Sequence, residues 1–299
     1  MEILLSIVIP ITRMAGRLQN LESWYATFNY QACEVIFVHD VQDHETSDEI
    51  KRLVHTNSFK NYHIVEGFYG GPGPARNAGL NISKGRWVTF WDSDDVVFPH
   101  AYINAVNVQD TSKTIVVGNY EVYQVNNGSI SQKLIPEREK IKAFAMNPGL
   151  WRVIFRRDCI GSTRFSKIRM GEDQIFIAQV LTKTQEISFV DSVMYRYFTG
   201  SSAQLTSNID AISDLKFAAL ESLSLCRSSK ETDFIFPSMI FERQIISGLR
   251  HGNLVTKIRL LGIQLIGFIL LSPLKRNQLI GAMRYIYQES FLRVTHETD

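Results

Sequence analysis

Residues 86–95 read RWVTFWDSDD, an apolar run that ends in three carboxylates within four positions. The run predicts a buried strand, and Asp92, Asp94 and Asp95 follow its carboxyl end directly. Crowded carboxylates repel one another unless a cation or hydrogen-bond donors compensate their charge. Mg²⁺ and Mn²⁺ take oxygen ligands and share them with substrate phosphates, so the cluster indicates a divalent-metal and diphosphate site. A solvated turn or a helix N-cap is the alternative interpretation of the same residues.

Upstream of this stretch, short β-branched runs alternate with amphipathic segments. Strands are expected at residues 5–9, 34–38, 62–65 and 87–91, and helices at 17–28, 46–55 and 74–83, with Ser47 capping the second helix. Continuous apolar strands that alternate with helices predict an α/β fold whose mostly parallel sheet is flanked by helices. Ligands of such sheets bind beyond the carboxyl ends of the strands, where both Asp40 and Asp92 are expected to lie.

Downstream, the pattern changes twice. Strands are expected at 114–118, 121–125, 129–134, 151–155, 187–190 and 194–198, with a hairpin turn at 126–128 and a helix at 171–181. From about residue 210 the signal is helical, with helices expected at 215–225, 234–249, 260–271 and 279–287. We therefore expect a domain at residues 1–208 and a C-terminal helical extension at 209–299.

The composition excludes some classes of protein. A hydrophobic fraction of 45% and a charged fraction of 21% are ordinary for a folded domain and exclude a mainly disordered chain. A net charge of +2 is too small for a basic stripe, so no nucleic-acid partner is expected. Cys33, Cys159 and Cys226 give no zinc pattern and suit thiols in a reducing cytoplasm. The first residues lack the basic start and the cleavage site of a signal peptide.

Six motifs occur in the order found in glycosyltransferase family 2, and the chain resembles the inverting members of that family, which have the GT-A fold and build bacterial polysaccharides. The motifs are SIVIP (6–10), EVIFVHD (34–40), ARNAG (75–79), the stretch at 85–95, GED (171–173) and YRY (195–197). A lone Asp-x-Asp occurs by chance in many proteins. The specificity of the resemblance lies in the joint order of the motifs over residues 5–205.

The resemblance implies a nucleotide-sugar donor and a metal. Contacts to the donor would come from Pro10, Thr12, Asp40, Arg76, Asp92, Ser93 and Asp94. Asp94 would be the principal ligand of Mn²⁺ or Mg²⁺, with Asp92 beside it and Asp95 in support. A UDP-sugar is favoured; dTDP- and GDP-sugars stay open because the family usually has two acids and a Gly-Ser where this chain has His39, Asp40, Val41 and Gln42.

The resemblance also implies the catalytic chemistry. Asp173 would be the general base that activates an acceptor hydroxyl for direct, inverting displacement, and Glu172 would orient the acceptor or the neighbouring loop. The transferred group would be a hexosyl or N-acetylhexosaminyl unit, and the acceptor a carbohydrate or a lipid-linked glycan. The alternative for the pair is a helix N-terminus that carries acidic residues because of the helix dipole.

Residues 260–271 are strongly apolar but too short to cross a bilayer, which needs about 20 residues. Lys257 and Arg259 precede this segment, and Lys275 and Arg276 follow it. An interfacial helix at 257–276, lying on the inner face of the plasma membrane, fits this pattern. A helix buried in a bundle or in a homodimer interface fits it as well and is the favoured interpretation.

Two other functions compete with glycosyl transfer. A nucleotidyltransferase would be expected to carry a glycine-rich, basic phosphate loop after the first strand, and residues 10–13 (PITR) do not form one. A non-catalytic nucleotide-binding module stays open because the chain departs from the family pattern at Thr12 and His39.

Overall fold

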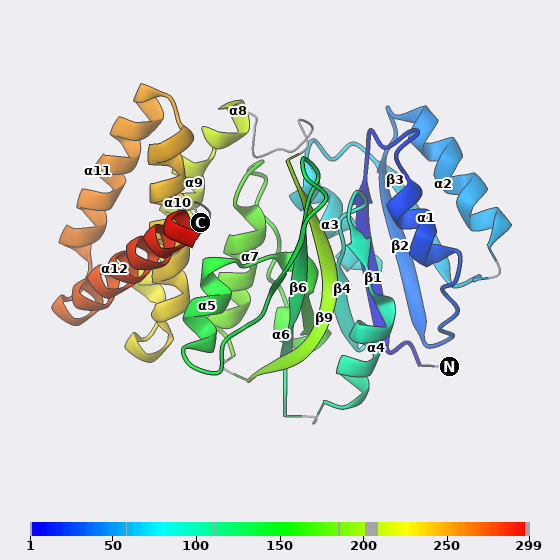
Figure 1. Ribbon diagram of the computed structural model, residues 1–299, viewed down its shortest axis with the longest axis horizontal. Helices are drawn as coiled ribbons and strands as arrows, with labels where there is room; N and C mark the ends of the chain where they lie inside the picture. Colours follow the sequence, from blue (N-terminus) through cyan, green and yellow to red (C-terminus); the bar gives the residue numbers. More distant parts are fainter. Residues whose placement is uncertain (1, 58, 110–111, 185, 201–208, 297–299) are drawn as a thin grey trace. The chain divides into compact units, whose positions relative to one another are not determined.

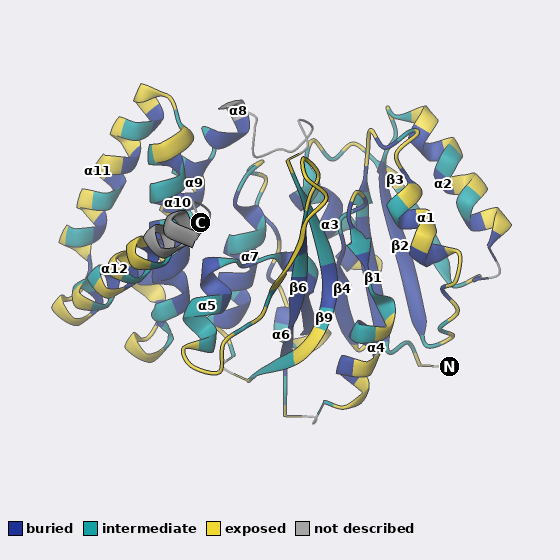
Figure 2. Cartoon of the chain, viewed as in Figure 1, coloured by how far each residue is buried: buried dark blue, intermediate teal, exposed yellow. Residues whose placement is uncertain are grey.

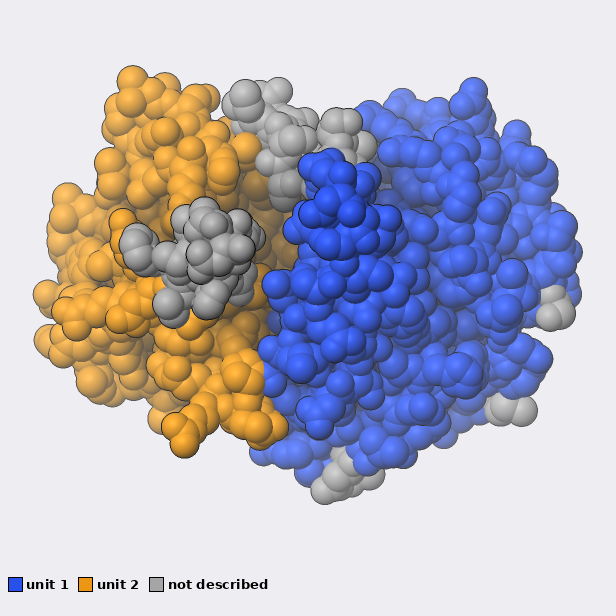
Figure 3. Space-filling model, viewed as in Figure 1, with its two compact units in different colours: residues 1–135, 149–167, 186–201 blue, residues 136–148, 168–185, 202–299 orange. Residues whose placement is uncertain are grey.

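The computed structural model describes residues 2–57, 59–109, 112–184, 186–200 and 209–296. The chain forms two compact units, coloured separately in Figure 3. Unit 1 comprises Met1–Ile135, Gly149–Lys167 and Glu186–Ser201, and unit 2 comprises Pro136–Pro148, Ile168–Gln185 and Ser202–Asp299. This division differs from a single cut at residue 208, because two earlier segments pack with the C-terminal helices. The expected functional domains, 1–208 and 209–299, stay a prediction.

Unit 1 is built on one mixed sheet with the strand order β3-β2-β1-β4-β8-β6-β9-β5, and β7 pairs with β6 (Figure 1). Strands β1 to β4 are mutually parallel, whereas β8 runs antiparallel to both β4 and β6. The strands are β1 (Leu5–Ile11), β2 (Cys33–Asp40), β3 (Tyr62–Gly67), β4 (Trp87–Phe90), β5 (Val96–Val97), β6 (Ile115–Gln124), β7 (Ile130–Lys133), β8 (Val153–Arg156) and β9 (Ile187–Thr199).

Two pairs of short strands expected from the sequence are in fact two long strands. The segments 114–118 and 121–125 both belong to β6, and 187–190 and 194–198 both belong to β9. The parallel β6–β9 ladder shifts register around Asn119 and then continues. The polar interruptions that suggested strand ends are therefore irregularities within one ladder.

Helices cover both faces of this sheet. They are α1 (Gln19–Tyr25), α2 (His44–Thr56), α3 (Pro72–Ile82), α4 (Pro99–Asn107) and the short α6 (Arg157–Ile160). The helices α1, α2 and α4 share a core with alternate residues of β1 and β2, such as Ile7 and Phe37. Helix α3 packs on the other face, where a Cβ on Gly79 would overlap the Val8 side chain.

The cap predicted for α2 was wrong. Asp43, not Ser47, occupies the N-cap, and its carboxylate accepts a hydrogen bond from the Thr46 N–H. Ser47 is buried one turn into the helix and donates to Glu66 on β3. Helix α4 was not expected, because its sequence carries no side-chain cap and only two turns of apolar spacing.

Unit 2 is helical. Its elements are α5 (Lys140–Met146), α7 (Glu172–Leu181), α8 (Ile209–Ile212), α9 (Leu215–Ser228), α10 (Ile235–His251), α11 (Leu254–Leu270) and α12 (Pro273–His296). Helix α10 contacts all the others and is largely buried, as its apolar sequence requires. Of the helices described, none is both long and apolar enough to cross a membrane.

Candidate active site

The first site feature is a shared edge of the sheet. Because β1, β2, β3 and β4 are parallel, their carboxyl ends lie together. Ile11 pairs with His39, and Asp40 pairs with Gly67, so β1, β2 and β3 end level with one another. Thr12, Asp40 and Asp92 all leave the sheet at this edge, which is where ligands of open α/β sheets bind.

Asp92 is held by Arg76 from helix α3. Nη2 of Arg76 lies 2.8 Å from Oδ1 of Asp92, and the Arg76 side chain is only 8% exposed against 31% for Asp92. The guanidinium also lies over the Phe165 ring, 5.7 Å from its centroid. The structure thus brings these two predicted residues together, with the arginine fixing the carboxylate.

Asp95 is held from the opposite side, by β9. Its Oδ2 accepts from the Tyr195 hydroxyl and its Oδ1 from the Phe198 N–H, each at 2.9 Å. Burial first, and then the charge of Asp94, raises the pKa of Asp95 well above its usual range. Asp95 therefore ties the acidic loop to the sheet, which agrees with a supporting role.

Asp94 is the most exposed of the three acids, and Ser93 beside it is buried. The Asp94 carbonyl accepts a 2.6 Å hydrogen bond from Nδ2 of Asn20, which fixes the backbone at this position. Desolvation by the surrounding loop, followed by the charge of Asp92, raises the pKa of Asp94. Its oxygen donors suit Mg²⁺ or Mn²⁺, since a cation would compensate the unfavourable charge that this raised pKa records.

An aromatic layer underlies the acidic loop. Trp91 is fully buried and packs edge-on against Trp24, with 5.1 Å between ring centroids, and against Tyr102 at 4.8 Å. Trp151 stacks on Tyr195 at 4.3 Å with an interplanar angle of 12°. The sequence analysis did not assign these aromatic residues to the site, because their partners come from distant segments.

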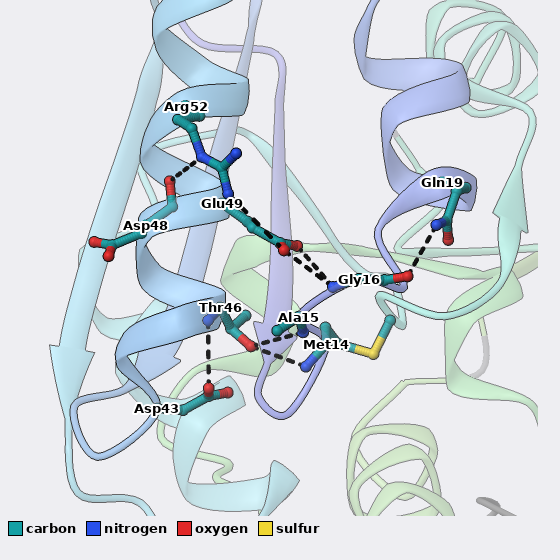
Figure 4. Close-up of polar contacts among 9 residues, drawn as sticks. All are labelled: Met14, Ala15, Gly16, Gln19, Asp43, Thr46, Asp48, Glu49 and Arg52. Carbon is teal, nitrogen blue, oxygen red and sulfur yellow. Dashed lines mark hydrogen bonds and ion pairs between the residues drawn. The ribbon is translucent and has the colours of Figure 1, made fainter.

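The loop after Thr12 is fixed by helix α2 (Figure 4). Four successive backbone N–H groups, those of residues 13–16, donate to side chains of α2 and its N-cap, and Figure 4 draws the last three of these contacts. Asp43 takes the first, the Thr46 hydroxyl takes the next two at 2.9 and 3.1 Å, and Glu49 takes the fourth at 3.0 Å. The β1–α1 loop therefore enters the site edge with a defined backbone.

Asp40 caps its own turn, which is the alternative role for a residue at a strand end. Its Oδ1 accepts from the Gln42 N–H at 3.1 Å. Tyr69, whose ring folds over Gly67, lies close enough for the Asp40 charge to add to the effect of burial in raising the Tyr69 pKa. The exposed Phe68 precedes Tyr69, and no motif in the sequence points to either aromatic residue.

Glu172 and Asp173 belong to unit 2, whereas Pro10, within β1, and the other predicted site residues belong to unit 1. They form the first turn of α7, after Gly171, whose φ of 88° favours glycine. Glu172 is buried. Oδ1 of Asp173 accepts from the Gln174 N–H at 2.8 Å.

Across residues 2–57, 59–109, 112–184, 186–200 and 209–296, no three His, Cys, Asp or Glu side chains are grouped so as to enclose a metal ion by themselves. The assignment of Asp94 and Asp92 as ligands of a divalent cation stays a prediction.

By sequence, the family model for glycosyl transferase family 2 matches residues 6–169. The glycosyltransferase GlyG of Streptococcus pneumoniae serotype 4 is 23% identical, over 69% of this chain and 74% of GlyG. The glycosyltransferase GlyA of the same organism is 22% identical over 64% of this chain, and the match covers only 30% of GlyA. The chain thus spans less than a third of GlyA.

By structure, the chain is similar to S. aureus TarS 1–349 in complex with UDP-GlcNAc, with a TM-score of 0.67 and 15% identity over 97% of this chain and 92% of the TarS chain. It is also similar to the mannosyltransferase PcManGT from Pyrobaculum calidifontis in complex with GDP-Man and Mn²⁺, with a TM-score of 0.58 and 13% identity over 97% of this chain and 88% of that one. These likenesses confirm the predicted fold: a mixed GT-A-type sheet flanked by helices, with a helical C-terminal region.

Proposed function

The chain belongs to glycosyl transferase family 2, and on that premise we propose that it moves a hexosyl or N-acetylhexosaminyl group from a nucleotide-sugar donor to a carbohydrate or lipid-linked glycan. The observation that carries this proposal is that the three acids of the acidic loop have different surroundings. Arg76 pairs with Asp92, β9 holds Asp95 through two hydrogen bonds, and Asp94 is the exposed residue of the three. One exposed carboxylate on a fixed loop is the arrangement that a metal–diphosphate contact needs.

We propose a UDP-sugar as the donor. TarS, which has the same fold, has been solved in complex with UDP-GlcNAc. That complex supports a UDP-sugar, the donor that the family resemblance also favours through Asp40. PcManGT, with GDP-Man and Mn²⁺, keeps a GDP-sugar as the alternative. Thr12 and Asp40 at the site edge would receive the nucleoside, with Phe68 and Tyr69 offering aromatic faces beside it.

The cofactor in this proposal is Mn²⁺ or Mg²⁺, held by Asp94 with Asp92 and completed by phosphate oxygens of the donor. A bound divalent cation neutralises charge on a leaving diphosphate, as a Lewis acid. Arg76 holds the Asp92 carboxylate in place, and Asp95 keeps the loop on the sheet. These residues bind and orient the donor before any bond changes.

Asp173 is the general base in this proposal. It accepts the proton of the acceptor hydroxyl while that oxygen attacks the anomeric carbon, and the nucleoside diphosphate leaves from the opposite face. One C–O bond forms, one breaks, and the anomeric centre inverts. Glu172, buried beside Asp173 in the chain, supports the first turn of α7. The cytoplasmic location stays a prediction.

The test is a screen of UDP-, dTDP- and GDP-sugars for slow donor hydrolysis, with Mn²⁺ or EDTA, on the wild-type protein, Asp94→Ala and the exposed control Asp48→Ala. We expect one nucleotide to be released in a metal-dependent way by the wild type and the control, and not by Asp94→Ala. Binding calorimetry on the same donors follows if none is turned over. Silence in both assays would overturn the proposal in favour of a protein that does not use nucleotide sugars.

A further inference from the structure

Helix α11 exposes a continuous apolar stripe. Leu254, Ile258, Leu261, Leu265 and Ile269 recur at three- and four-residue spacing, and each is 56–72% exposed. This spacing places them on one side of the helix. Figure 2 shows exposed residues recurring along α11. Five large aliphatic side chains in one exposed row form a patch that a soluble surface rarely leaves uncovered.

The opposite side of α11 already satisfies the core of unit 2. Leu260, Ile263 and Gly267 are buried, and the first two belong to a cluster with Leu223 of α9 and Phe241 of α10. The buried side alone therefore anchors α11 to unit 2. The exposed stripe takes no part in this core and is available to a partner.

The charge around the stripe has one sign. Between Glu242 and Glu289 the sequence has no acidic residue but seven lysines and arginines. On the helix, Arg259 lies on one flank of the stripe and Lys257 on the other, because their positions fall about 100° to either side of its centre. The partner that this pattern fits is apolar at its centre and anionic at its surface.

A cationic hollow lies at the carboxyl end of the same helix. It has a volume of about 760 Å³, and its lining includes the cations Arg227 and Lys230, the acid Glu231, and Leu270 and Leu271. Leu270, the last residue of α11, is itself exposed.

Buried Lys275 forms part of the wall of this hollow. Its Nζ donates to the carbonyls of Cys226, Arg227 and Ser229 at 2.6–3.0 Å and so caps α9. The lining thus has three cations against one acid, Glu231, and one of these cations, Lys275, is already bonded to carbonyls.

We propose that α11 docks on an anionic lipid bilayer, with the stripe entering the interface and Lys257, Arg259 and Arg227 facing lipid phosphates. Apolar burial and attraction of cations to anionic lipids act together in such helices. A second copy of the chain is a poorer partner. A two-fold contact through this face would bring the flanking cations of both copies together with no acidic residue from the same region. The proposal goes beyond the glycosyl transfer proposed above and does not depend on it.

The test is flotation of the full chain with vesicles of phosphatidylcholine alone or of phosphatidylcholine and phosphatidylglycerol in equal parts. We expect binding to the anionic vesicles only, weakened by salt. The apolar variant I258E/L265E and the charge variant K257E/R259E should each bind the anionic vesicles at least roughly tenfold more weakly than the wild type. The matched controls are V108E, at another highly exposed apolar residue, and K84E/R86E, with the same spacing of two exposed cations. Both controls should bind as the wild type does.

Three results would each overturn the proposal. The first is a wild-type protein that stays unbound with anionic vesicles at low salt, and the second is a K257E/R259E variant that floats as well as the wild type. The third is a lipid-free dimer, measured by sedimentation velocity, that I258E/L265E converts to a monomer, because the stripe would then be a protein interface. Circular dichroism checks folding, and the charge variant keeps the test decisive if the apolar variant unfolds.

Discussion

The hydroxyl of Tyr195 donates a 2.9 Å hydrogen bond to Oδ2 of Asp95, and both residues are buried. The bond joins the middle of β9 to the acidic loop after β4, across a hundred positions of sequence. Tyr195 is held in turn by its stack on Trp151, whose carbonyl accepts from the Tyr102 hydroxyl at 2.5 Å. The position of the acidic loop thus depends on a buried aromatic layer that the acidic motif alone does not reveal.

Tyr195→Phe tests this connection. The ring and its stack remain, but buried Asp95 loses one donor, which should lower the free energy of unfolding by about 1–3 kcal/mol. The affinity for the nucleotide sugar should fall as well, because the loop that carries Asp94 is less well fixed. Urea denaturation and donor titration measure the two effects. Tyr287→Phe, on an exposed ring, is the control, and equal stability of the two variants would contradict the role assigned to Tyr195.

The Arg76–Asp92 pair gives a second test. Arg76→Met keeps the aliphatic volume but leaves Asp92 without its guanidinium, so the protein should bind the donor roughly tenfold more weakly and lose stability by about 1–3 kcal/mol. Arg76→Lys should recover part of both, because the charge returns without the planar fork. A donor affinity unchanged in Arg76→Met would show that Asp92 does not contact the donor. Arg86→Met, at an exposed arginine, is the matched control.

The local elements of unit 1 were predictable because each carries its own periodic signal. The buried runs of β1, β2 and β4 and the helices α2 and α3 lie where the pattern placed them. The predicted acids of unit 1 meet at one edge because parallel strands end together. The pairing of Asp95 with Tyr195 and of the 13–16 backbone with Thr46 is set by tertiary packing, and no sequence spacing encodes it. For the same reason the packing of α5 and α7 among the C-terminal helices follows from no local sequence signal.

Thr46 carries a third prediction. Its buried hydroxyl accepts from the N–H groups of both Met14 and Ala15, so Thr46→Val leaves two donors of the β1–α1 loop without that acceptor. We expect the free energy of unfolding to fall by about 1–3 kcal/mol. The KM for the nucleotide sugar should rise with little change in kcat. Thr56→Val, at the other end of α2, is the control, since its hydroxyl bonds only within the helix. A higher KM in both variants would remove the assignment of this loop to the site.

Glu242 predicts how stability depends on pH. Burial raises its pKa from the ordinary 4.5 to about 7, and the bond that Gln264 donates at 2.7 Å opposes only part of this. A folded-state pKa above the unfolded value means that the folded protein holds the proton more tightly. The resulting stabilisation is full below about pH 4.5 and is lost as the pH rises through about 7. The free energy of unfolding should fall by roughly 3 kcal/mol over this range.

Denaturation of the wild type and Glu242→Gln between pH 5 and 8.5 measures this effect. The variant, whose amide stays neutral, should lose the decline and be the more stable protein at pH 8.5. Glu22→Gln, at an exposed glutamate, should follow the wild type. Parallel curves for all three proteins would show that Glu242 is charged in the folded state.

Asp173→Asn separates binding from catalysis. An amide keeps the size of the side chain and its acceptor oxygen for the Gln174 N–H, so folding and donor affinity should stay near those of the wild type. It cannot take a proton, and transfer to an acceptor should fall by about 10²–10⁴-fold in kcat. The control Asp191→Asn changes an exposed acid and should retain full transfer. Full transfer by Asp173→Asn would place the base elsewhere and reduce the acids at the start of α7 to partners of the helix dipole.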